Sequence, residues 1–387
     1  MCAFLIGEIS MENAGIYIHI PFCLSKCSYC DFTSVPLNDT VGRYVSSLLK
    51  ELQIKAHILR DYNIDTIFIG GGTPSAIESE HIGNIIKTVY DCFAVAKNAE
   101  ITIEVNPGTV DKYKAESYNY LGINRISMGI QSFDDHLLGC LGRAHTGENA
   151  INTVKILKDS GFNNMNGDFI FGQPGQTLES FLNDLKTASE LGLSHISMYG
   201  LIIEDGTLMK RWLDEGFVKL PDEDLEREMY HQGIRLLSME KYHQYEISNL
   251  SREGMECRHN IGYWRLKPYI GAGLSAHSNI GSKRFWNTSS FAEYFKKIEG
   301  CEMPVEDEEN LDSETRASEY IILGLRMNEG IDYVEFENRF GFDAKKRFGA
   351  VIDKHRRGGL LTKSNTHLRL TKKGMDLSNI VEIDFLP

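Results

Sequence analysis

The feature that most constrains the fold is an alternation of short β-branched segments with helical segments along the first two thirds of the chain. Strands are expected at Ile16–Ile20, Thr66–Ile69, Ile101–Val105, Arg125–Ile130, Asp168–Phe171 and His195–Ile202, with Tyr245–Ser248 as a further candidate. Amphipathic helices are expected near residues 41–52, 77–93, 147–160, 177–191 and 222–240. Six successive βα units predict a parallel sheet, which is either open or curled into a full or partial barrel.

Polar and glycine-rich stretches follow the C-terminal ends of the predicted strands. They are Cys23 to Cys30, Gly70 to Pro74, Glu104 to Gly108, Gln131, and Asp168 with Gly172 to Gly175. In parallel βα folds this edge of the sheet is where ligands bind. Because successive units carry such residues at the same edge, the sequence predicts one shared site.

Three cysteines follow the first predicted strand closely. Cys23, Cys27 and Cys30 stand at spacings of four and three, whereas the other five cysteines are scattered and are expected to be free thiols. Clustered thiolates favour a soft metal, which means an iron–sulfur cluster or zinc. Zinc needs four ligands, and His19 is the nearby candidate for the fourth. A [4Fe–4S] cluster held by three thiolates leaves one iron open, and the spacing favours this cluster without excluding zinc or no metal at all.

The segment Gly70-Gly-Gly-Thr-Pro74 forms a second candidate ligand-binding turn. Glycines there expose backbone groups and permit a ligand to approach closely. The segment is not a dinucleotide or P-loop fingerprint, because it has neither the glycine spacing nor a Gly-Lys-Ser/Thr sequence. Taken alone, it is better explained as a tight strand-to-helix turn without a ligand.

Together, the cysteine spacing and the glycine turn resemble the radical S-adenosylmethionine (SAM) superfamily, whose fold is a partial (βα)6 barrel. Further motifs resemble the oxygen-independent coproporphyrinogen III oxidase family, and this resemblance runs from about residue 15 to near the C-terminus. These motifs are Tyr17 to Cys23, Gly70 to Ser75, Glu104 to Gly108, Asn124 to Phe133, Leu141 to His145 and Gly172 to Gln176. The resemblance implies an α/β fold with a partial (βα)6 barrel and a smaller, mostly helical C-terminal domain.

The resemblance also implies a cofactor and a set of ligand residues. Cys23, Cys27 and Cys30 would bind a [4Fe–4S] cluster whose unique iron holds SAM. The residues implied to contact SAM are Tyr17, Tyr29, Gly71, Gly72, Thr73, Glu104, Gln131, Arg143 and Asp168. A carboxylate such as Glu104 suits ribose hydroxyls, because it accepts hydrogen bonds. Each polar side chain alone is equally compatible with an ordinary hydrogen bond inside a barrel, and a second SAM molecule is left open.

Within this family the sequence is more similar to the heme chaperones than to the decarboxylating enzyme. The enzyme carries a further cysteine two positions after the third, where this chain has Phe32, and it has a longer segment before the cysteines. The chaperones carry an HNxxYW motif, here His259, Asn260, Tyr263 and Trp264. These four residues are implied to contact heme, since imidazole ligates iron and aromatic rings pack on porphyrins.

Several alternatives accompany this interpretation. The motif from His259 to Trp264 is also explained as a packed aromatic turn, and His277 and Cys257 are rival heme ligands. The expected function is a heme chaperone that passes heme to apo-hemoproteins, and the alternative is anaerobic decarboxylation of coproporphyrinogen III. A radical SAM enzyme acting on RNA is disfavoured by the net charge of -13.

The expected organisation is a barrel over residues 14–240, an aromatic and glycine-rich extension over 241–300, and a C-terminal domain over 315–387. The acidic stretch from Glu302 to Glu314 is expected to be a linker, and residues 358–362 and 368–371 are expected to form a hairpin. With no apolar window long enough for a membrane span and no signal-peptide pattern, a cytoplasmic protein is expected. Either Met1 or Met11 can be the first residue, and a homodimer and peripheral membrane association stay open.

Overall fold

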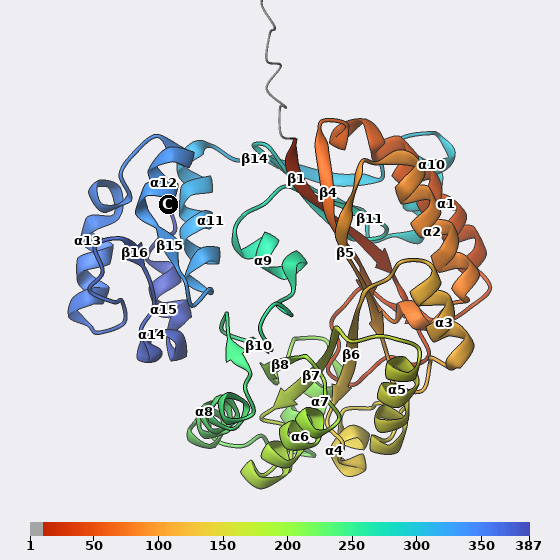
Figure 1. Ribbon diagram of the computed structural model, residues 1–387, viewed down its shortest axis with the longest axis horizontal. Coiled ribbons are helices and arrows are strands. Elements are labelled where there is room, and N and C mark those ends of the chain that lie inside the picture. Colours follow the sequence, from red (N-terminus) through yellow and green to blue (C-terminus); the bar gives the residue numbers. More distant parts are fainter. Residues whose placement is uncertain (1–10) are drawn as a thin grey trace, which may run out of the picture.

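The computed structural model describes residues 11–387, in which twelve strands form one sheet (Figure 1). The strand order is β14-β13-β12-β11-β1-β4-β5-β6-β7-β8-β10-β9. The six strands that match the predicted βα units are β1 (Glu12–Ile20), β4 (Tyr62–Gly71), β5 (Val95–Val105), β6 (Arg125–Gln131), β7 (Met165–Phe171) and β8 (His195–Gly200). They are parallel to one another. The predicted parallel sheet is therefore confirmed. The first ten residues, including Cys2, lie outside the described range.

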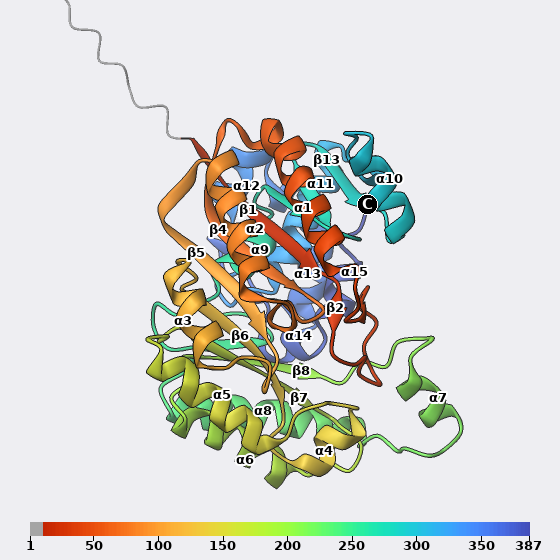
Figure 2. The same ribbon diagram turned by 90° about the vertical axis from the view of Figure 1, so that its right-hand side faces the viewer.

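These six strands form a partial barrel whose outer side is covered by helices (Figures 1 and 2). The helices are α1 (Val41–Lys55), α2 (Ser79–Cys92), α3 (Lys112–Tyr120), α5 (Gly147–Asp159), α6 (Leu178–Glu190) and α8 (Glu223–Met239), with the short helices α4 (Asp135–Cys140) and α7 (Leu208–Asp214) in the loops. The barrel does not close, because β1 pairs with β11 and β8 pairs with β10 on their free sides. No helix among residues 11–387 is long and apolar enough to cross a membrane.

The segment after the barrel extends the sheet at both ends. Its elements are β9 (His243–Gln244), β10 (Asn249–Ser251), α9 (Arg258–Trp264), β11 (Tyr269–Ala272), β12 (His277–Ile280), β13 (Lys283–Asn287), α10 (Phe291–Glu299) and β14 (Val305–Asn310). The acidic residues expected to form a linker thus include an edge strand. Cross-strand pairing explains it: Lys283 on β13 lies 3.0 Å from Glu308, and Arg284 lies 3.4 Å from Glu309.

The candidate strand Tyr245–Ser248 is wrong in position. These residues separate β9 from β10, and part of their backbone bonds to the C-terminal part of the chain. The Ile247 N–H donates to the Arg326 carbonyl (3.1 Å), and the Asn328 N–H donates to the Tyr245 carbonyl (2.9 Å). This segment therefore connects the barrel to the C-terminal region.

The C-terminal region has its own hydrophobic core, which includes Phe336, Ile321 and Phe385. Its elements are α11 (Ser313–Leu325), β15 (Ile331–Asp332), α12 (Tyr333–Phe340), α13 (Ala344–Arg357), β16 (His367–Leu368), α14 (Lys372–Asp376) and α15 (Ser378–Ile383). The two segments of the predicted hairpin meet at one antiparallel bridge, Leu361 to Leu370. The β16 strand, however, pairs with β15.

A fully buried ion pair fixes α1 against the extension of the sheet. Glu51 and Lys55 have no solvent exposure, and their charged atoms lie 2.6 Å apart. Glu51 also accepts hydrogen bonds from the Gly273 N–H, the Tyr294 hydroxyl and the Asn287 amide, and Lys55 donates to the Gly271 carbonyl and to Asn287. Because every charged group finds several partners, the pair is stable despite its burial.

We expect Lys55→Met to destabilise the protein by about 3–5 kcal/mol, because it leaves the Glu51 carboxylate buried without its cation. The measurement is the free energy of unfolding from urea titration. Lys50→Met is the matched control on the exposed face of the same helix, and its effect should stay within about 0.5 kcal/mol. Equal effects of the two substitutions would contradict this account.

Candidate functional site

The cysteine loop begins at the C-terminal end of β1. Its first part pairs as β2 (Phe22–Cys23) with β3 (Val35–Pro36). Farther along, the Ser28 N–H donates to the Leu141 carbonyl at 3.0 Å, which fastens the loop to the loop that follows β6. All three thiols are partly exposed. The loop is thus held at both ends while its sulfur atoms stay accessible.

Two neighbouring side chains donate to the cysteine sulfurs. The Arg143 guanidinium lies 3.4 Å from Cys27 Sγ, and the Thr73 hydroxyl lies 3.6 Å from Cys23 Sγ. Burial and the neighbouring thiols raise the pKa of Cys30. Among residues 11–387, no three His, Cys, Asp or Glu side chains surround a point suited to a single metal ion.

The glycine turn after β4 packs directly against this loop. Gly71 has φ +115°, and a Cβ there would lie 2.5 Å from the His19 ring. A Cβ at Gly72 would lie 2.8 Å from the Phe22 carbonyl oxygen and 3.0 Å from Cys23 Sγ. Glycine is therefore required at position 71 by conformation and by close approach, and at position 72 by close approach. The backbone N–H groups of Gly72 and Thr73 donate to the carbonyls of Ile20 and Phe22.

Glu104 stands at the end of β5, opposite the glycine turn. Its carboxyl accepts a hydrogen bond from the Gly71 N–H at 2.9 Å. Burial, together with the nearby Asp168, raises the pKa of Glu104 to about 8, against the lowering effect of the Gly71 bond. Near neutral pH this carboxyl is therefore largely protonated and can both donate and accept hydrogen bonds.

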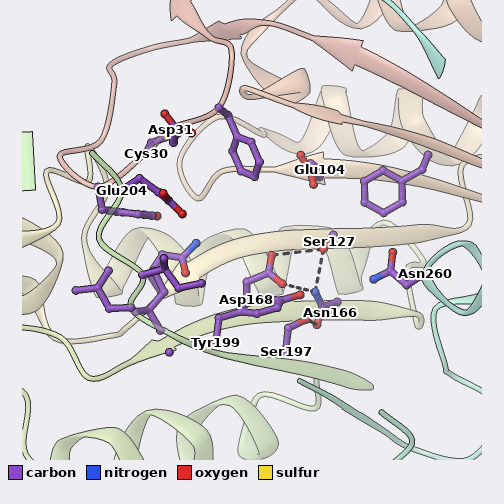
Figure 3. Close-up of a pocket in the computed structure, with 18 of the residues that line it drawn as sticks. Cys30, Asp31, Glu104, Ser127, Asn166, Asp168, Ser197, Tyr199, Glu204 and Asn260 are labelled. Atoms are coloured by element: carbon purple, nitrogen blue, oxygen red, sulfur yellow. Dashed lines mark hydrogen bonds between the residues drawn. The ribbon is translucent and has the colours of Figure 1, made fainter. Parts of the chain in front are cut away.

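A cavity of about 690 Å³ extends from the cysteine loop along the inside of the barrel (Figure 3). Five of the predicted SAM contacts line it: Tyr17, Tyr29, Glu104, Gln131 and Asp168. Figure 3 shows Cys30 at one end of the cavity and Asn260 at the other. Arg143 does not line this cavity. It contacts the cysteine loop at Cys27 and also donates to Asn106 (2.8 Å) and to the Gly129 carbonyl (2.7 Å). The cavity thus joins most, but not all, of the predicted residues.

The remaining polar lining was not identified from the sequence. It includes Arg125, Ser127, Asn166 and Ser197, which line the cavity together with Asp168. The Asn166 amide donates to Ser127 and to Asp168, each at 2.8 Å (Figure 3). Each of these residues lies an even number of positions from Gln131 or Asp168, or faces them from β8. Side chains alternate between the two faces of a strand, and this alternation is the sequence signal that could have identified these residues.

Comparisons with known proteins agree with this architecture. A family model of the radical SAM superfamily matches residues 17–188, and a model of the HemN C-terminal domain matches residues 311–377. The chain is 34% identical to heme chaperone HemW of Lactococcus lactis, with 96% of each chain covered. It is 33% identical to heme chaperone HemW of Escherichia coli, with 97% of this chain and 99% of that one covered. The chain belongs to the HemW heme chaperone family.

A solved structure matches the fold of this HemW family member. Coproporphyrinogen III oxidase (HemN) from Escherichia coli superposes with a TM-score of 0.85, over 97% of this chain and 90% of that one. The two chains are 22% identical, so this likeness concerns the fold. The predicted fold class, a partial (βα)6 radical SAM barrel with a smaller C-terminal domain, is confirmed.

The HNxxYW segment of this HemW family member forms α9, which packs between the barrel and the C-terminal region (Figure 1). His259 is buried, and its Nδ1 and Nε2 atoms each lie 2.9 Å from a hydroxyl, of Thr66 and Tyr263 respectively. Burial lowers the pKa of His259 to about 3, so its ring is neutral. Trp264 lies under the Arg326 guanidinium, 4.4 Å from the ring centre. Among the four motif residues, Asn260 is the one that lines the cavity.

The two rival ligands predicted from the sequence also have packing partners. Cys257 is fully buried, with its sulfur 3.8 Å from Glu100 Oε1. The His277 ring stacks on Trp286 at 5.5 Å between centres. Phe32, by contrast, is 67% exposed and lines the cavity beside the cysteine loop. Phe32 therefore contributes aromatic surface to the cavity, whereas His259, Tyr263 and Trp264 of the HNxxYW motif do not line it.

We expect Glu104→Gln to stabilise the ligand-free protein, and the gain should grow as the pH rises. The folded-state pKa of about 8 exceeds the ordinary value of 4.5. Between these values the unfolded chain releases a proton that the folded chain retains, so the free energy of unfolding of the wild type falls with rising pH. Above about pH 8 the ionisation of Glu104 has lowered the free energy of unfolding by its full amount, which is on the order of a few kcal/mol.

The measurement compares the Tm of the variant and of the wild type at pH 5 and pH 8. The difference between them should be larger at pH 8 by several degrees. Glu116→Gln, which changes an exposed carboxyl on α3, should show no such pH dependence. A constant difference across this range would show that Glu104 is ionised in the folded protein.

Proposed function

We propose that this protein binds heme and transfers it to apo-hemoproteins, and that it holds a [4Fe–4S] cluster and SAM. The observation that carries the proposal is the similarity to HemW chaperones over nearly the whole of both chains. The cavity between the cysteine loop and α9 supports it, because its size is that of a ligand site. A cytoplasmic location belongs to the same proposal.

The cysteine loop fits an iron–sulfur cluster. Cys23, Cys27 and Cys30 provide three sulfur donors, the ligands such clusters require. Arg143 and Thr73 donate hydrogen bonds to two of these sulfurs, and such contacts tune a cluster's potential. The cluster would supply one-electron chemistry and one iron open to a further ligand.

The part of the cavity that Tyr17, Glu104 and Asp168 line fits SAM. Tyr17 and Asp168 face it, and Glu104 presents a buried carboxyl able to donate and accept hydrogen bonds to hydroxyl groups. Tyr17 is oriented by His19, whose Nδ1 lies 2.9 Å from the tyrosine hydroxyl and whose Nε2 donates to the Thr33 carbonyl. The roles of Gly71, Gly72 and Thr73 are then to shape the turn that supports the cysteine loop.

The cavity has apolar lining residues that suit a porphyrin ring. They are Phe32, Phe68, Ile170, Leu201 and Ile202, whereas Ser127, Asn166 and Asp168 supply hydrogen-bonding groups. A flat apolar ring with charged substituents matches such a mixed lining. Because His259 has both ring nitrogens engaged, we propose that the HNxxYW motif serves mainly to position Asn260 at the cavity.

Oxidative decarboxylation of coproporphyrinogen III is the alternative, and the fold shared with HemN is the observation that favours it. Heme titration of the anaerobically reconstituted protein separates the two functions. We expect a saturable change in heme absorbance, transfer of that heme to an apo-globin, and no protoporphyrinogen from coproporphyrinogen III with SAM and reductant. Absence of saturable binding, or formation of the decarboxylated product, would overturn the proposal.

We expect Cys27→Ala to abolish incorporation of iron and sulfide, because two thiolates do not retain such a cluster. The measurements are iron and sulfide analysis and the visible absorbance after reconstitution. Cys301→Ala is the matched control, since this cysteine is exposed and distant in sequence from the loop. The control should bind as much iron as the wild type, and retention of iron by Cys27→Ala would contradict the assignment.

A further inference from the structure

Arg125 is a buried cation that lines the cavity. The residue is 2% exposed, yet it lines the cavity. Its Nε atom finds no acceptor among residues 11–387. Arginine stays charged in proteins, and a buried charge is ordinarily paired. We therefore expect an anionic partner for this guanidinium.

Glu100 and Asp168 are acidic side chains near Arg125, and each accepts hydrogen bonds from other groups. Glu100 accepts the backbone N–H groups of Arg258 and His259, each at 3.0 Å, and so caps the N-terminus of α9. Asp168 accepts from the Asn166 amide. Burial raises the pKa of Asp168, and it raises the pKa of Glu104 to about 8, so Glu104 contributes little negative charge near neutral pH. Glu100 and Asp168 act on the charge of Arg125, but no acceptor among residues 11–387 bonds to its Nε, which leaves that N–H available to a ligand.

The position of Arg125 separates it from the cysteine loop. It is the first residue of β6, whereas Gln131 ends this strand on the side of the loop. With a rise of about 3.3 Å per residue, the two positions lie roughly 20 Å apart along the strand. Asn260 also lines the cavity, at the end opposite Cys30 (Figure 3). An anion at Arg125 thus belongs to a ligand that reaches the inner end of the cavity.

We propose that Arg125, assisted by Asn260, forms a carboxylate-binding subsite at the inner end of this cavity. A guanidinium binds a carboxylate with two parallel hydrogen bonds, and the Asn260 amide can donate another. The identity of the ligand rests on the proposed function: the subsite accepts a propionate of heme. The apolar ring of the heme then contacts apolar lining residues such as Phe68. The carboxylate of a SAM molecule is the other source of the same chemistry.

Heme and heme dimethyl ester, whose propionates are esterified, provide the direct test. We expect Arg125→Gln to raise the Kd for heme by about tenfold or more, as loss of a charge-assisted hydrogen bond predicts. The Kd for the dimethyl ester should change by less than about twofold, because it has no carboxylate to lose. Equal effects on both ligands, or no effect on either, would overturn the subsite.

Two variants control for charge and folding. Arg60→Gln removes the same charge from an exposed site and should leave both Kd values unchanged. Asn260→Asp leaves Arg125 in place but puts a negative charge at the subsite, so it should weaken heme binding and spare the ester. If Arg125→Gln does not fold, Asn260→Asp serves as the test of the subsite. Unchanged heme affinity in Asn260→Asp would then reject the subsite.

The source of the carboxylate is separated by a SAM titration. If the wild type binds neither heme nor its ester, the proposed heme function fails, and SAM and decarboxylated SAM replace them as the ligand pair. Weaker binding of SAM but not of decarboxylated SAM by Arg125→Gln would then assign the subsite to SAM. In that case, equal binding of SAM by Arg125→Gln and by the wild type would reject the subsite.

Discussion

The alternation of side chains along six parallel strands is the constraint on which this structure depends. Every second residue of a strand faces the barrel interior, so each strand contributes polar groups at successive depths. On β7, Asn166, Asp168 and Ile170 all line the cavity, and on β8, Ser197 and Tyr199 do so. The residues between them, such as Phe169, fill the core under the helices. One strand therefore builds both the hydrophobic core and the site.

Burial in this interior creates functional groups at a cost to stability. Glu104 is shielded from water, so its carboxyl retains a proton to about pH 8. Arg125 is buried, and its Nε has no acceptor within residues 11–387, an arrangement that native cores rarely contain. The surrounding fold offsets these costs through fully satisfied networks, of which the pair of Glu51 and Lys55 is the clearest. Ligands that complete the hydrogen bonds of the cavity would stabilise the folded state further.

The sequence predicts the parallel sheet, its helices and the cysteine edge, because these follow from local periodicity and from motifs that stand directly after strands. It also leads to Glu104 and Asp168. It does not reveal Arg125, which starts a strand rather than ending one and so lies away from the expected edge. The burial of His259 cannot be predicted from the sequence either, because its Nδ1 partner Thr66 is 193 residues away. Contacts of that range follow from topology and not from local pattern.

The helix α9 shows why the HNxxYW motif can matter to ligand binding although most of its side chains are buried. Glu100, from inside the barrel, binds the first N–H groups of α9, and Thr66 holds the ring of His259. Trp264 meanwhile packs under Arg326 in the C-terminal region. The motif thereby fixes α9 from both sides and places Asn260 at the cavity that Arg125 also lines. Packing residues and a ligand-facing residue can thus belong to one motif, because the position of one side chain depends on the anchoring of the others.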